Sequence, residues 1–89
     1  MTAVVPPAVW VHGRDVSWMI VHLDAGVYLS LEVSPGAGTP NPWSYLVELC
    51  GPEDEVLDRR TGRSRNALHA RAQAVKVARE LRVAASNSL

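Results

Sequence analysis

The chain changes its hydrophobic period once, and this change limits the folds that it can adopt. Between residues 27 and 33 apolar and polar side chains alternate strictly, as expected for a strand with one buried face. Residues 43–50 repeat this alternation, and residues 16–23 are apolar at nearly every position. After Ser64 the apolar residues recur at intervals of three and four, which is the spacing of one helix face. Strands followed by one helix predict an α+β fold.

We expect an antiparallel sheet of three to four strands with one C-terminal helix packed on one face, because short turns separate the strands. The predicted strands and helix follow the changes of period. The strands cover about 8–12, 16–23, 27–33 and 43–50, and the helix covers about 64–85.

The two periods also assign side chains to the core. Alternate residues from Val27 to Val33 and from Trp43 to Leu49 are expected to face the helix. Because the helix face toward them is mostly alanine, the helix axis can lie close to the sheet, with Ser64 as the predicted N-cap. The other sheet face mixes apolar, acidic and small residues. Its expected members are Tyr28, Ser30, Glu32, Ser44, Leu46, Glu48 and Cys50.

Length and composition favour one small globular domain over residues 1–89, with a modest core. Of the three tryptophans, we expect at least two to be buried, among them Trp18 in the apolar strand. Cys50 is the only cysteine, so no intramolecular disulfide can form, and a reducing, cytoplasmic location is predicted. The N-terminus lacks the pattern of a signal peptide, and no apolar run reaches the length of a membrane span.

The formal net charge of zero conceals two oppositely charged halves. Residues 1–58 carry eight acidic residues against Arg14, a balance of −7. Residues 59–89 carry eight basic residues against Glu80, a balance of +7. Such asymmetry indicates either a segment that binds polyanions or acidic and basic surfaces that meet within or between molecules.

The densest positive charge is the run from Arg59 to Arg65, predicted as a loop leading into the helix. Arginine side chains and free N–H groups at a helix start together could bind phosphate. His69, Lys76 and Arg79 would extend this basic surface along one helix face. The candidate anion-binding or partner-binding residues are therefore Arg59, Arg60, Arg63, Arg65, His69, Lys76 and Arg79.

A structural alternative is that the acidic residues directly upstream neutralise the arginine run across the turn. Glu53, Asp54, Glu55 and Asp58 are close enough in sequence to reach the arginines. We favour this pairing, since exposed ion pairs between neighbouring segments are common and need no ligand.

Catalytic and metal chemistry find little support in the sequence. His12, His22 and His69 are far apart and lack neighbours at the spacing of metal ligands, and Cys50 has no recognisable base. We therefore predict no enzyme activity, no metal and no cofactor. The leading hypothesis is a non-catalytic interaction or regulatory protein that contacts itself, as a homodimer, or another protein. A nucleic-acid-binding module is the alternative.

Overall fold

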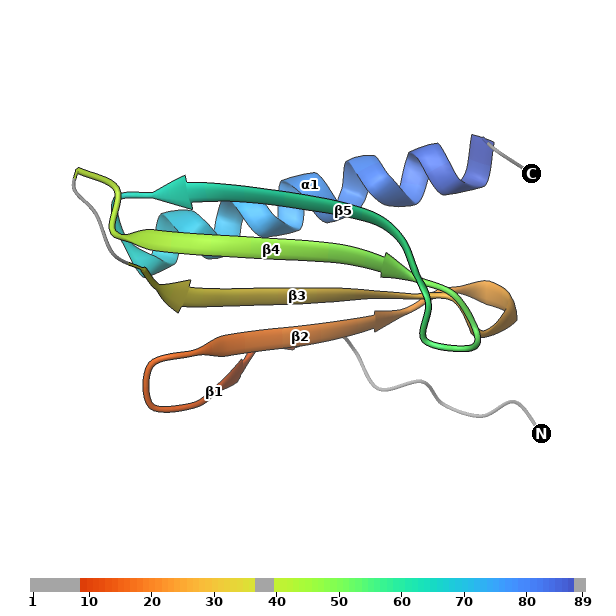
Figure 1. The fold of residues 1–89 in the computed structure, drawn as a ribbon, viewed down its shortest axis with the longest axis horizontal. Coiled ribbons are helices and arrows are strands. Elements are labelled where there is room, and N and C mark those ends of the chain that lie inside the picture. Colours follow the sequence, from red (N-terminus) through yellow and green to blue (C-terminus); the bar gives the residue numbers. More distant parts are fainter. Residues whose placement is uncertain (1–8, 37–39, 88–89) are drawn as a thin grey trace.

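The computed structural model describes residues 9–36 and 40–87. Five antiparallel strands form one sheet in their order along the chain (Figure 1). The strands are β1 (Val11–His12), β2 (Ser17–His22), β3 (Tyr28–Pro35), β4 (Trp43–Cys50) and β5 (Val56–Ser64). The helix α1 (Ala67–Asn87) lies behind the sheet in Figure 1, so the uncovered face points toward the reader. The predicted α+β fold is confirmed, with five strands instead of three to four.

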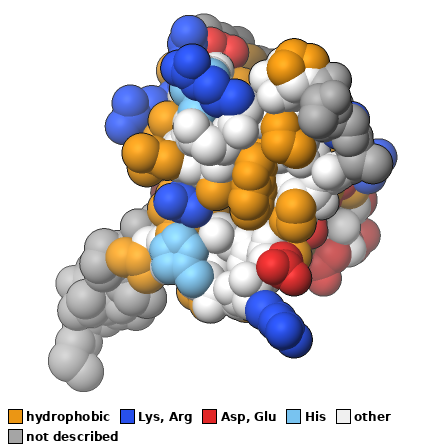
Figure 2. Space-filling model, turned by 90° about the vertical axis from the view of Figure 1, so that its left-hand side faces the viewer, with side chains coloured by type: hydrophobic (Ala, Val, Ile, Leu, Met, Phe, Trp, Pro, Cys, Tyr) orange, Lys and Arg blue, Asp and Glu red, His pale blue; other side chains and the backbone are white. Residues whose placement is uncertain are grey.

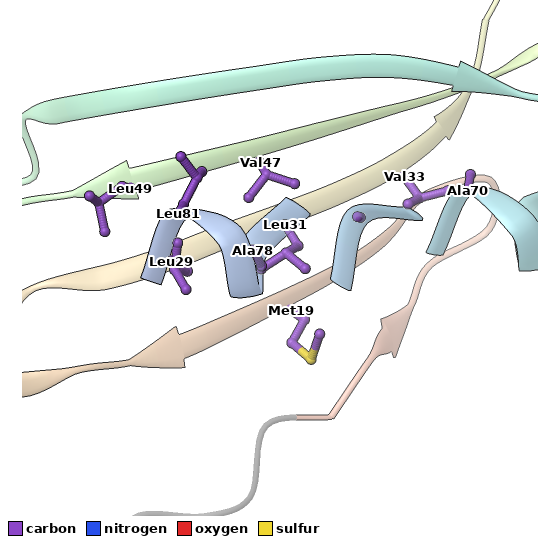
Figure 3. Close-up of a cluster of buried hydrophobic side chains, with 10 residues drawn as sticks. Met19, Leu29, Leu31, Val33, Val47, Leu49, Ala70, Ala78 and Leu81 are labelled. Atoms are coloured by element: carbon purple, nitrogen blue, oxygen red, sulfur yellow. The ribbon is translucent and has the colours of Figure 1, made fainter. Parts of the chain in front are cut away.

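The core lies between α1 and one face of the sheet, which we call the covered face. In Figure 3 apolar side chains from β2, β3 and β4 meet the buried residues of α1. Leu31, Val33 and Val47 are fully buried, as the alternation predicted. The covered face consists mainly of Met19, Leu29, Leu31, Val33, Val47 and Leu49.

Alanine lines the helix side of this core, as predicted. Ala70 and Ala74 are fully buried, and Leu81 is the largest buried side chain of α1. Small side chains allow the helix to approach the sheet closely. The predicted N-cap was wrong: Ser64 ends β5, and the Asn66 side chain accepts a hydrogen bond from the His69 N–H at 2.8 Å.

The fifth strand replaces the predicted loop between Arg59 and Arg65. It pairs with β4 from Trp43 opposite Ser64 to Cys50 opposite Val56, with one irregularity at Leu49 and Cys50. Charged residues occupy this strand because it is the outermost of the sheet, where charge discourages pairing with other chains. An exposed edge strand has no apolar alternation, and the sequence pattern therefore missed it.

Gly62 lies within β5 because an aromatic ring occupies the space above it. A Cβ atom built on Gly62 would collide with the ring of Tyr45, the residue opposite it on β4. A ring that covers a strand glycine compensates for the packing surface that the glycine lacks. The Tyr45 ring therefore fills the space over Gly62 on the covered face.

The tryptophans differ from the prediction. Trp10 and Trp43 pack against the core and remain partly exposed, whereas Trp18 is 42% exposed on the uncovered side of β2. The strand β2 is apolar on both faces although α1 covers only one of them. Within the described residues, no helix is both long and apolar enough to cross a membrane.

Candidate functional site

The predicted basic cluster is divided among three surfaces. Because side chains alternate along β5, Arg59 and Arg63 lie on the uncovered face of the sheet, and Arg60 lies on the opposite side. Arg65 follows the strand and is exposed. The phosphate site expected at the start of the helix therefore does not form from the arginine run.

Two of these arginines form ion pairs. Arg59 donates from Nε and Nη2 to the same carboxylate oxygen of Glu48, at 3.0 and 2.7 Å. Glu48 is directly opposite Arg59 on β4, so the strand register creates the pair. Arg60 Nη1 lies 2.6 Å from Asp58 Oδ1, two residues earlier on the same strand. The predicted neutralisation by upstream acidic residues is confirmed for Asp58, and Glu48 was not anticipated.

Two acidic residues of the turn between β4 and β5 bond to groups other than the arginines. Glu55 accepts a hydrogen bond from the Glu53 N–H, and Asp54 accepts one from the Tyr28 hydroxyl at 2.8 Å. The bond to Asp54 stabilises the protonated phenol and raises the pKa of Tyr28 well above its usual value. Arg63 donates from Nε to the Asn41 carbonyl at 3.1 Å.

The helix presents a separate basic stripe. His69, Lys76 and Arg79 are exposed, and their spacing places them on the side of α1 away from the sheet. Arg65 is also exposed, but it precedes the helix, which begins at Ala67, and so lies outside the stripe. Neither of the two ion pairs found among the described residues involves this stripe. Figure 2, which views one end of the molecule, shows Lys and Arg side chains at several separate places and no continuous patch.

The uncovered side of the sheet, which we call the open face, carries the predicted Leu46 and also apolar residues of β1 and β2 that sequence reasoning did not place there. Trp18 and Ile20 are 42% and 41% exposed, and Val11 lies beside Trp18 on β1. Leu46 is half-buried two strands away, in register with Glu32 on β3. The continuous apolar run of β2 could have signalled a strand with apolar side chains on both faces.

A shallow hollow of about 450 Å³ lies on the open face where β3, β4 and β5 run side by side. Leu46 and Thr61 are opposite each other within it, and the Ser34 and Ser44 hydroxyls lie 3.4 Å apart at one side. Arg63 and Glu32 complete its lining. The hollow thus offers an apolar surface beside hydroxyl groups and charges of both signs.

Other reactive groups show structural contacts. Ser17 Oγ and His12 Nδ1 are 2.8 Å apart because these residues are opposite each other on β2 and β1. The Cys50 thiol is free and buried. Among residues 9–36 and 40–87, no three His, Cys, Asp or Glu side chains come together as metal ligands.

Comparisons with protein-family models, with curated proteins and with solved structures find no match to this chain. The geometry of the described residues is therefore the basis for assigning a function.

Proposed function

We propose that the protein is a small, non-catalytic, cytoplasmic interaction protein that forms a homodimer through the open face of its sheet. The observation that carries the proposal is the exposure of Trp18 and Ile20 on this face. Antiparallel sheets with one solvated face usually present polar residues on it, and β2 departs from this rule. A second copy would remove both side chains from water. The free thiol of Cys50 suits a reducing compartment.

The charges of the open face balance, so they do not exclude a second copy of the same surface. Glu32 and Glu48 carry negative charge at its centre, and Arg59 and Arg63 carry positive charge on β5. In a two-fold dimer each surface meets itself, so a surface with equal numbers of both charges brings no net charge repulsion to the contact.

The size of the face sets the expected strength of association. Strands of eight residues are about 26 Å long and five strands span about 19 Å, so the projected area is at most roughly 500 Å², because β1 and β2 are shorter than eight residues. A stable interface of standard size buries about 800 Å² on each partner. We therefore expect a dissociation constant on the order of micromolar or weaker.

Light scattering across a concentration series tests the proposal. The wild type should pass from 9.7 kDa toward twice this mass between about 10 and 300 µM. Ile20→Asp should remain monomeric throughout, because it places a charge within the apolar contact. The matched control is Leu68→Asp, at a position on α1 that is 72% exposed. It should behave as the wild type. A wild-type mass of 9.7 kDa at every concentration would reject the homodimer.

The basic stripe of α1 supports a second candidate function, which is nucleic-acid binding. The observation in its favour is that His69, Lys76 and Arg79 are exposed on one side of the helix, outside the described ion pairs. Binding to a generic duplex at low salt should then weaken steeply with added salt. Replacing Lys76 and Arg79 by Gln should abolish it, whereas the Arg59→Gln control on the sheet should not. Absence of binding by the wild type at about 50 mM salt excludes this candidate.

A further inference from the structure

We infer that Trp18 of each copy inserts into the hollow on the open face of the other copy. This inference rests on the proposed homodimer and specifies its geometry. The same face carries both the partly exposed Trp18 ring and a hollow, and a two-fold arrangement can match each ring with a hollow at the same time.

The Trp18 ring packs against the turn between β1 and β2, which restricts its position. A Cβ atom on Gly13 would lie 3.0 Å from the Trp18 ring, so the ring lies directly over this glycine. The Gly13 N–H donates to the Val16 carbonyl at 2.7 Å and closes the turn beneath the ring. Because the turn already restricts the Trp18 side chain, ordering this side chain in a contact costs little conformational entropy, which favours binding.

The hollow has the size and chemistry to receive an indole ring. Its volume of about 450 Å³ exceeds the roughly 150 Å³ of an enclosed cavity that holds benzene. Leu46 and Thr61 offer apolar contact, and the Ser34 and Ser44 hydroxyls can accept the indole N–H. Arg63 also lines the hollow, and a guanidinium can contact the face of an aromatic ring.

The strand register makes the two insertions compatible. Trp18 pairs with Glu32, Glu32 with Leu46, and Leu46 with Thr61, so these residues form one row across the sheet. Consider a two-fold axis that runs above β3, parallel to the strands. This axis places β2 of each copy over β4 of the other copy, and the two rows of residues then lie one above the other. Each Trp18 then lies over Leu46 and Thr61 of its partner. The same axis brings the two Glu32 side chains together, so their repulsion should weaken the dimer.

Sedimentation of four variants tests this geometry. Thr61→Trp fills the hollow and should raise the dimer dissociation constant at least about tenfold, while Thr61→Val should leave it unchanged. Trp18→Ala should cause a similar loss, and Glu32→Gln should tighten the dimer. A melting curve for each variant establishes that it folds.

The outcomes separate the two proposals. A monomeric wild type contradicts the proposed function itself. If the wild type dimerises and Ile20→Asp abolishes the dimer, the proposed function stands. If Thr61→Trp and Trp18→Ala then dimerise as the wild type does, the insertion of Trp18 is wrong.

Discussion

The two faces of the sheet follow different rules. On the covered face, residues such as Leu31 and Val47 are fully buried against alanines of α1, so close packing determines which residues fit. On the open face, Trp18 and Ile20 of β2 remain exposed, and the ion pair of Arg59 and Glu48 lies on β4 and β5 of the same face. The covered face accounts for the fold. The open face has more apolar surface than the fold requires, and we attribute this surplus to a partner.

The largest expected effect compares one charge on each face. Leu31→Asp should unfold the protein, with a loss of about 4 kcal/mol or more, because an unpaired carboxylate would enter the core. Ile20→Asp, on the open face, should cost about 1 kcal/mol, mainly through its poorer strand propensity. Thermal denaturation of both variants checks the comparison. Equal stability of the two would show that the faces do not differ in burial.

A smaller effect is expected at neighbouring residues of β5. Gly62→Val should destabilise the protein by about 1 to 3 kcal/mol, because its side chain collides with the Tyr45 ring on the covered side. Thr61→Val, on the open side of the same strand, should change the free energy of unfolding by less than about 0.5 kcal/mol. Urea denaturation measures both. A neutral Gly62→Val would mean that the Tyr45 ring does not lie over this glycine.

The smallest effect concerns the ion pair on the open face. Arg59→Gln, Glu48→Gln and the double variant form a mutant cycle, and we expect a coupling of about 0.2 to 1 kcal/mol that decreases with salt. Such a value would show that the charges of the open face contribute little to folding, in contrast to the buried residues of the covered face. A coupling near 3 kcal/mol would assign this pair a structural role comparable to the core.

The parts of the fold with strong hydrophobic periodicity could be predicted from the sequence. The strand at 43–50 coincides with β4, and the alternation of 27–33 identified the buried residues of β3. The strand β5 could not be found this way, because its exposed residues follow no apolar pattern and Gly62 is typical of a turn. What makes β5 a strand is its pairing with β4, which is a long-range interaction.

The candidate site was predicted only in part. The arginines were recognised as a feature, but their division between two faces of β5 depends on an alternation that exists only once the strand forms. The Glu48 partner of Arg59 follows from strand register, which sequence spacing does not reveal. The exposure of Trp18 was missed for another reason. A continuous apolar run has the same sequence pattern whether one or both faces of the strand are covered, so the sequence does not reveal that one face of β2 is open.

The most direct test of the proposed dimer is the solvent accessibility of Ile20. This residue is the only isoleucine of the chain, so its δ1-methyl group gives a single, unambiguous NMR signal. A soluble paramagnetic agent should enhance its relaxation strongly in dilute protein and progressively less as the protein concentration rises. The Val83 methyls on the exposed side of α1 serve as the control and should stay accessible throughout. An Ile20 methyl that remains equally accessible at every concentration would contradict the burial of the open face between two copies.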